Sequence, residues 1–150
     1  MVVGPVIFTA ATEELLEQVD SSGDKVVART TAARRGDALV TRREDLPRFA
    51  GEEIVVVPSP LLPHPLSDRR EDYTMGVLIS LNGIKVMNLR HLATLVRDSR
   101  HDFFVFEFGG RYVRPLVLPR AACIAATEEI LSKSRIPKRA SADILSILKE

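Results

Sequence analysis

Three histidines are the first residues in this chain that could do chemistry, because imidazole binds metal ions and transfers protons near neutral pH. They are His64, His91 and His101. None lies three or four residues from another histidine, and none shares a predicted helix with an acidic partner at metal-ligand spacing. The spacing therefore predicts no metal site, and no other motif indicates a cofactor.

The carboxylates and the candidate nucleophiles give no stronger indication of a catalytic site. Glu13-Glu14 and Glu128-Glu129 are adjacent pairs, and adjacent side chains on a helix point apart, so neither pair is expected to act as acid and base. The Ser22-Gly23 step lies in "DSSGD", where flanking acids would oppose a developing oxyanion. This segment is typical of a turn, and the sequence predicts no catalytic residue.

Composition limits the class of protein further. The chain has 150 residues, of which 45% are apolar, enough for one domain with a buried core. Its 21 basic and 20 acidic residues nearly cancel, which argues against a general nucleic-acid or membrane-surface binder. The single cysteine, Cys123, excludes an internal disulfide and a cysteine-built zinc site. No apolar run reaches the ~18 residues that a membrane span needs.

The start of the chain, "MVVGPVIFTA", has no basic flank and no helical targeting pattern. It is expected to open directly on a core strand. Such a start suggests a piece of a longer protein.

The most informative stretch is "LISLNGIKVMNLRHLATLV", residues 78–96. Two β-like runs flank Asn82-Gly83, and this pair predicts a type I′ turn, since both central positions need positive φ. Asn88 can then cap a helix. The helix carries an apolar stripe at three- and four-residue spacing, formed by Leu89, Leu92, Leu95 and Val96.

Other segments are assigned by the same periodicities. Alternating or continuous apolar runs predict strands over 6–10, 54–60, 102–108 and 111–118. Helical stripes and caps predict helices over 11–19, 119–133 and 141–149. Residues 25–53 form a loop-rich insertion crowded with arginines; a solvated loop is favoured over a nucleic-acid patch, because Phe49 is the only aromatic residue among them.

Taken together, these segments resemble a known family of domains. The run "LISLNGIKVMNLRHLATLV" is similar to the core of PDZ domains, in which a hydrophobic strand, an Asn-Gly turn and a leucine-bearing helix follow one another. With "VIFTAATEELLEQV" and "SRIPKRASADIL" included, the chain resembles the second PDZ domain of eukaryotic Deg/HtrA-type serine proteases of the plant and protist group. The resemblance covers about 6–20 and 54–145, and residues 25–53 contribute nothing to it.

The resemblance implies a parent protein that is an ATP-independent serine endopeptidase. Its catalytic domain and first PDZ domain would lie upstream of this chain. In such families the PDZ domains bind peptide segments or unfolded protein, or hold protomers together in trimers and hexamers. Chloroplast, mitochondrion and nucleus are all locations of the family, and the sequence does not choose among them.

A PDZ groove would bind an extended peptide by adding it as a strand beside Val6 to Ala10. The resemblance implies Phe8 on one side of the pocket, Leu92 and Val96 on the helix opposite, and backbone N–H groups at Gly4 to Ile7 as the cradle for a terminal carboxylate. Pro5 has no N–H, so one donor is missing from that cradle. The alternative interpretation is that all these residues are core and Gly4-Pro5 leads into the strand.

The expected fold is therefore α+β, mainly β: a PDZ-like, partly open antiparallel β-barrel with two main helices and a short C-terminal helix. Residues 1–137 would form the domain, and 138–150 a helical tail. That tail places Ile144, Leu145 and Leu148 on one side, which suggests assembly contacts with another protomer; folding back onto the barrel is the alternative. The expected function is a non-catalytic module for assembly and regulation of the protease, and the alternative is an active peptide receptor.

Overall fold

The computed structural model describes residues 1–15, 46–67, 73–110 and 113–149. Two expectations fall wholly or mostly outside this part: the Ser22-Gly23 turn and the insertion over 25–53. The helix predicted over 11–19 is described as far as residue 15, and residues 13–15 are helical. The described end of that insertion, residues 46–53, is largely exposed and contains no regular element.

The N-terminal half of the fold contains four short strands: β1 (Val2–Val3), β2 (Val6–Ile7), β3 (Thr9–Ala10) and β4 (Val55–Val56). β1 and β2 form an antiparallel hairpin, and β3 pairs antiparallel with β4. Only Phe8 separates β2 from β3, so residues 6–10 run as one nearly continuous strand. A single bridge from Val56 to Val77 joins this region to the next strand in the chain.

The second half of the fold is built on a four-stranded antiparallel sheet in the order β6-β5-β7-β8. Its strands are β5 (Leu78–Leu81), β6 (Ile84–Lys85), β7 (Phe103–Phe108) and β8 (Leu116–Pro119). β8 begins later than the sequence predicted. The residue before it is Pro115, which has no N–H to donate to a neighbouring strand.

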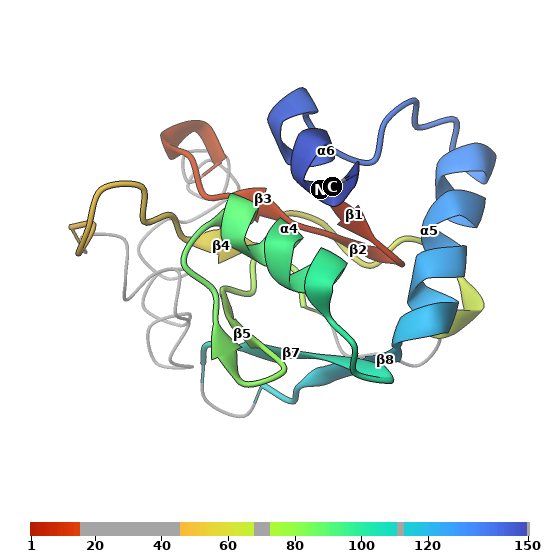
Figure 1. The fold of residues 1–150 in the computed structure, drawn as a ribbon, viewed down its shortest axis with the longest axis horizontal. Helices are drawn as coiled ribbons and strands as arrows, with labels where there is room; N and C mark the ends of the chain where they lie inside the picture. Colours follow the sequence, from red (N-terminus) through yellow and green to blue (C-terminus); the bar gives the residue numbers. More distant parts are fainter. Residues whose placement is uncertain (16–45, 68–72, 111–112, 150) are drawn as a thin grey trace, which may run out of the picture.

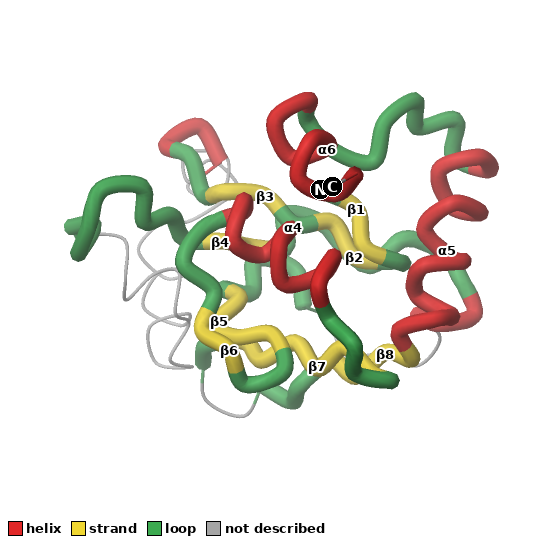
Figure 2. The backbone as a smooth tube through the Cα atoms, viewed as in Figure 1, coloured by secondary structure: helices red, strands yellow, loops and turns green. Residues whose placement is uncertain are grey.

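The helices whose bounds lie within the described ranges are η1 (Pro65–Ser67), α4 (Leu89–Asp98), α5 (Arg120–Lys133) and α6 (Ala142–Lys149). Figure 1 shows α4 crossing the front of the molecule between the two strand regions, α5 along one end, and α6 beside the start of the chain. Figure 2 shows the strands β1 to β4 on one side of α4 and the four-stranded sheet on the other. No helix in the described ranges is long and apolar enough to cross a membrane.

The predicted turn and cap are confirmed. Asn82 has φ 50° and Gly83 has φ 77°, both positive as a type I′ turn requires. Asn88 is extended, and its side chain accepts a hydrogen bond from the His91 N–H over 2.7 Å. These local signals place α4 immediately after the β5–β6 hairpin.

The core lies between the two strand regions and α4. Phe104, Phe106 and Phe108 alternate with more exposed residues along β7 and face inward. The Phe8 ring lies 5.1 Å from the Phe106 ring, measured between centroids, so the N-terminal strand and the sheet share one core. Leu92 of α4 is fully buried in the same cluster.

The predicted α+β, mainly β class is confirmed. In the described part of the chain, all paired strands are antiparallel, and they form separate sheets that do not close into a barrel. The partly open arrangement follows from the short strands, which leave α4 and α5 to cover the remaining openings.

Candidate functional site

The candidate groove is built on the strand over 6–10. Thr9 pairs with Val56, and the Ala11 N–H donates to the Ile54 carbonyl over 2.7 Å. Because backbone groups alternate sides along a strand, residues 7, 9 and 11 direct their N–H and C=O groups toward β4. The backbone groups of Val6 and Phe8 consequently point to the opposite edge.

That opposite edge is paired with the first residues of the same chain. Val3 is the register partner of Val6, and the Phe8 N–H donates to the Met1 carbonyl over 2.8 Å. The Met1 nitrogen in turn donates to the Phe8 carbonyl over 2.7 Å. β1 therefore occupies the edge at which an added strand would have to pair.

The Gly4-Pro5 turn that joins β1 to β2 is tightly held. Gly4 has φ 56°, and its N–H donates to the Thr127 hydroxyl of α5 over 2.7 Å. The Pro5 carbonyl accepts from the Leu62 N–H over 2.7 Å. The expected cradle thus has one donor missing at Pro5 and another already bound at Gly4.

Most of the apolar groove candidates pack in or against one cluster. Val6, Phe8 and Leu92 belong to one buried cluster, and Val96 packs against it partly buried. Ile7 is half-buried. Val6, Phe8 and Leu92 are fully buried.

The C-terminal tail packs beside the same region. α6 lies against α4, and Ile144 is 2% exposed, whereas Leu145 and Leu148 are half-buried. Arg97 of α4 donates to the Ile147 carbonyl over 3.0 Å, and Arg90 lies 3.5 Å from the Asp143 carboxylate. The tail is therefore folded back on its own domain, which is the alternative stated above.

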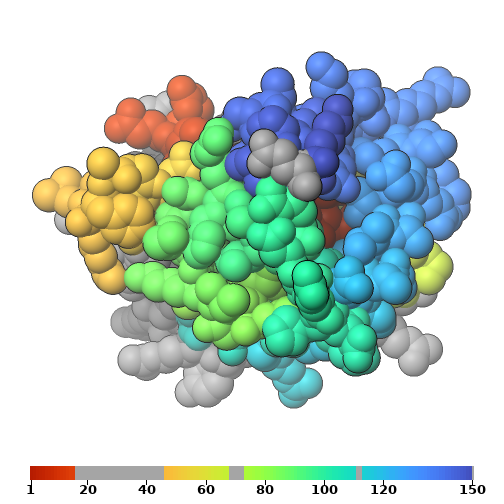
Figure 3. Space-filling view, viewed as in Figure 1, coloured from red at the N-terminus to blue at the C-terminus, as the bar shows by residue number. Residues whose placement is uncertain are grey.

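β1 is enclosed by these elements. Val2 and Val3 are buried, β1 packs against α5, and the Val2 N–H donates to the Arg139 carbonyl over 2.7 Å. On the face shown in Figure 3, the first residues appear only as a small dark red patch among the surfaces of α4, α5 and α6. Sequence reasoning missed this enclosure, and it missed the roles of Thr127 and Arg97.

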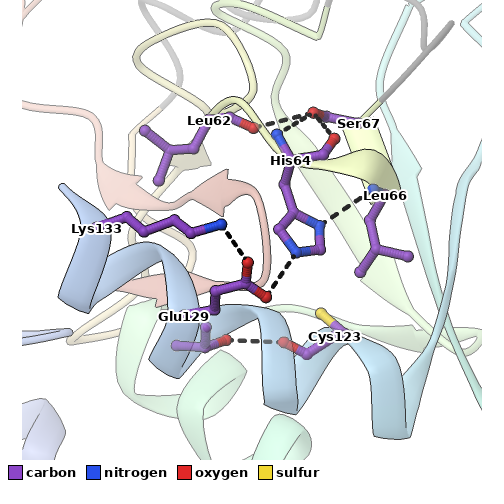
Figure 4. Close-up of polar contacts among 8 residues, drawn as sticks. Leu62, His64, Leu66, Ser67, Cys123, Glu129 and Lys133 are labelled. Atoms are coloured by element: carbon purple, nitrogen blue, oxygen red, sulfur yellow. Dashed lines mark hydrogen bonds and ion pairs between the residues drawn. The ribbon is translucent and has the colours of Figure 1, made fainter.

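A polar cluster fastens the loop before η1 to α5 (Figure 4). The His64 Nδ1 accepts from the Leu66 N–H over 3.1 Å, and its Nε2 lies 3.5 Å from Glu129. Glu129 also accepts from Lys133 over 2.5 Å. The Lys133 hydrogen bond, followed by the one from His64, lowers the pKa of the Glu129 carboxyl.

This cluster has the residue types of a catalytic site without the required geometry. The Ser67 hydroxyl lies 2.6 Å from the His64 carbonyl and 3.0 Å from the Leu62 carbonyl, and its recorded bonds go to backbone and not to the imidazole. Cys123 is buried, and desolvation raises the pKa of its thiol to about 12, which keeps it protonated and unreactive. Among the described residues, no group of three metal-binding side chains lies together.

The antiparallel fold, in which the strand over 6–10 and α4 pack on one apolar core, is typical of a protein-interaction domain. The family model for the PDZ domain matches residues 1–143, and this chain belongs to the PDZ family. Over 147 residues it is 32% identical to "Protease Do-like 2, chloroplastic" of Arabidopsis thaliana. That alignment covers 97% of this chain and 22% of the Arabidopsis protein, so the chain spans about a fifth of its relative's length. The expected kinship to the Deg/HtrA group is confirmed.

Proposed function

We propose that this PDZ domain is a non-catalytic module of a Deg/HtrA-type serine endopeptidase, and that it serves assembly of the protease oligomer and its regulation. The observation that carries the proposal is the pairing of β1 with the outer edge of the strand over 6–10. Similarity to a chloroplast protease supports the protease context.

The argument rests on what a PDZ ligand needs. PDZ domains bind extended peptides by adding them to a free strand edge, so that main-chain hydrogen bonds supply much of the affinity. Here the Phe8 N–H and C=O already bond to Met1. A peptide could pair at this edge only after β1 leaves, and the buried Val2 and Val3 side chains oppose that departure. Affinity for a free peptide is reduced by this competition.

The C-terminal tail, residues 138–150, is proposed to contribute to contacts between protomers. Ile144 is used inside the domain, but Leu145 and Leu148 are only half-buried on a helix that forms the outer surface. Apolar area left on an outer helix is available for contact with a second protomer. The proposed partners are therefore other protomers of the protease, in a trimer or hexamer.

A second candidate function is the active peptide receptor, which would bind peptide segments or unfolded protein for the protease. Its support is that β1 is only two residues long and that Val6, Phe8, Leu92 and Val96 pack in or against the same apolar cluster as Val3 of β1. Release of so short a strand would open the edge without dismantling the four-stranded sheet.

Peptide titration separates these two functions. Labelled peptides with free and amidated C-termini are titrated into the 150-residue chain. An assembly module should show no binding at about 1 μM, equivalent to about −8 kcal/mol. Binding at that level that is lost on amidation would establish the receptor instead.

Assembly itself is tested in the full-length protease by deleting residues 138–150 and measuring mass by light scattering. A smaller oligomer is expected. An unchanged oligomer with a lowered melting temperature would restrict the tail to stabilising its own domain.

The absence of catalysis is tested with the isolated chain and casein as unfolded substrate. No hydrolysis is expected. Hydrolysis that disappears in Ser22→Ala would overturn the non-catalytic assignment.

A further inference from the structure

A pocket of about 280 Å³ lies at the C-terminal end of α4, between the β5–β6 hairpin and the segment that leaves the helix. Its apolar lining includes Leu81, Ile84 and Leu95. None of these residues is a groove candidate. The strand over 6–10, whose edge pairs with β1, contributes no residue to the pocket. Because its size is at the lower limit of ligand pockets, on the order of 300 Å³, it has room for one or two side chains and not for a large cofactor.

The exposure of Ile84 shows that the apolar core is incompletely covered at this pocket. It is the direct register partner of Leu81, and directly opposed residues point to the same face of a sheet. Leu81 is 2% exposed, whereas Ile84 is 50% exposed on that same inward face. The hairpin end thus carries an apolar side chain that is half uncovered beside a buried core residue.

The walls of the pocket are held together by Asn82. Its side-chain oxygen accepts from the Val105 N–H over 2.7 Å, and its side-chain nitrogen lies 3.5 Å from the Ser99 hydroxyl. The Ser99 N–H closes the end of α4 on the Leu95 carbonyl over 3.0 Å. The Asn82 side chain therefore holds the hairpin tip to β7 and also reaches the residue that follows α4, which gives the pocket two linked walls.

The rim carries a surplus of positive charge. Both carboxylate oxygens of Asp98 are bound by Arg97, over 2.7 and 3.0 Å, and Arg97 also offsets the negative end of the α4 dipole. Arg100 also lines the pocket and is exposed. It makes no hydrogen bond or ion pair among the described residues, although after Arg97 its charge also lowers the pKa of the Asp98 carboxyl. Arg120 bonds the carbonyl of His101 over 2.9 Å, which brings another guanidinium to the rim. Asp102 is the other acidic residue in this segment, so basic side chains outnumber acidic ones.

We propose that this pocket docks a peptide segment that inserts one aliphatic or aromatic side chain and places a neighbouring carboxylate on Arg100. The inserted side chain covers Ile84 and Leu95, and the carboxylate takes the guanidinium as a charge-assisted partner. This site lies outside the PDZ groove, so it operates whether or not β1 vacates its edge.

The test is an NMR titration of the isotope-labelled 150-residue chain with the probe acetyl-Glu-Glu-Phe-Glu-Glu-amide. Its blocked C-terminus removes the carboxylate that a PDZ cradle would bind. Saturable shifts are expected at 81–84 and 95–101. Affinity should fall by about tenfold or more in Arg100→Glu, fall also in Ile84→Ser, and stay unchanged in the matched control Arg48→Glu. All three positions are exposed or half-exposed, and the spectra show directly whether each variant is folded.

Several outcomes would overturn the proposal. They are the absence of saturable shifts, shifts centred on 6–10 and Leu92, and an affinity that Arg100→Glu leaves unchanged. Equal binding of the lysine-flanked probe acetyl-Lys-Lys-Phe-Lys-Lys-amide would refute recognition of a carboxylate. Because peptide reception by the groove is read at 6–10, the two sites are distinguished in one experiment.

Discussion

The backbone N–H of Val2 donates a hydrogen bond to the carbonyl oxygen of Arg139 over 2.7 Å. This contact joins β1, which closes the edge of the candidate groove, to the segment that leads into α6. Since α6 also bonds to α4 through Arg97 and Ile147, the strand and the tail hold each other in place. Loosening the tail is therefore expected to loosen β1.

Ile144→Ala tests how firmly the tail is docked. Ile144 is 2% exposed against α4, so its truncation should cost about 2–4 kcal/mol of unfolding free energy. Leu148→Ala is the matched control, and its half-buried side chain should cost clearly less. Urea unfolding of the three proteins measures both values. Equal losses would show that α6 does not dock through Ile144.

Gly83→Val tests the hairpin. Gly83 has φ 77°, which a β-branched residue resists, and an added Cβ would meet no atom within 4 Å. The expected loss of about 1–3 kcal/mol is therefore a backbone effect. Gly83→Asn is the control, because asparagine tolerates positive φ. A thermal midpoint that Val leaves unchanged would contradict the type I′ turn.

Gly4→Ala tests the close approach of β1 to α5. Gly4 has φ 56°, and an added Cβ would lie 2.5 Å from the Cys123 sulfur. The substitution should destabilise the fold by about 1–3 kcal/mol. In a Cys123→Ala background the loss should be smaller, because the sulfur is gone while the backbone strain remains. Strictly additive losses in this double-mutant cycle would show that the sulfur does not cause the cost.

Alkaline pH should destabilise the domain through Cys123. Burial raises the pKa of this thiol from 9.0 to about 12, so the unfolded chain loses the proton first. The stabilising contribution is complete below pH 9.0 and is lost as pH rises toward 12. Unfolding free energies measured at several pH values should fall more steeply than in Cys123→Ala. Identical slopes would contradict the burial effect.

The Cys123 thiol should also be unreactive in the native protein. Because the thiolate is the nucleophile and Cys123 is fully buried, Ellman's reagent should react only as fast as the domain opens. After unfolding in urea, the thiol should react completely with the reagent. Rapid reaction in the native state would place Cys123 at an accessible surface.

Several features could be predicted from the sequence because they depend on neighbouring residues. The Asn82-Gly83 turn follows from the φ values that these two residue types tolerate, and the Asn88 cap follows from a side chain that reaches a donor three residues on. The alternation of buried and exposed residues along β7 follows from strand geometry. The same segments carry the resemblance to the PDZ family, which the family match confirms.

Only the tertiary structure decided what the groove contains. The resemblance implied that the Gly4 N–H is free to bind the terminal carboxylate of a peptide. In the structure this N–H donates to the Thr127 hydroxyl, and β1 pairs with the edge that Val6 and Phe8 present. Likewise, the apolar stripe on the C-terminal helix suggested contacts with another protomer, with folding back onto the barrel as the alternative. A two-residue strand and an eight-residue helix have too little local preference to select a partner. Their positions are set by burial and hydrogen bonds between segments distant in the chain, which no local pattern records.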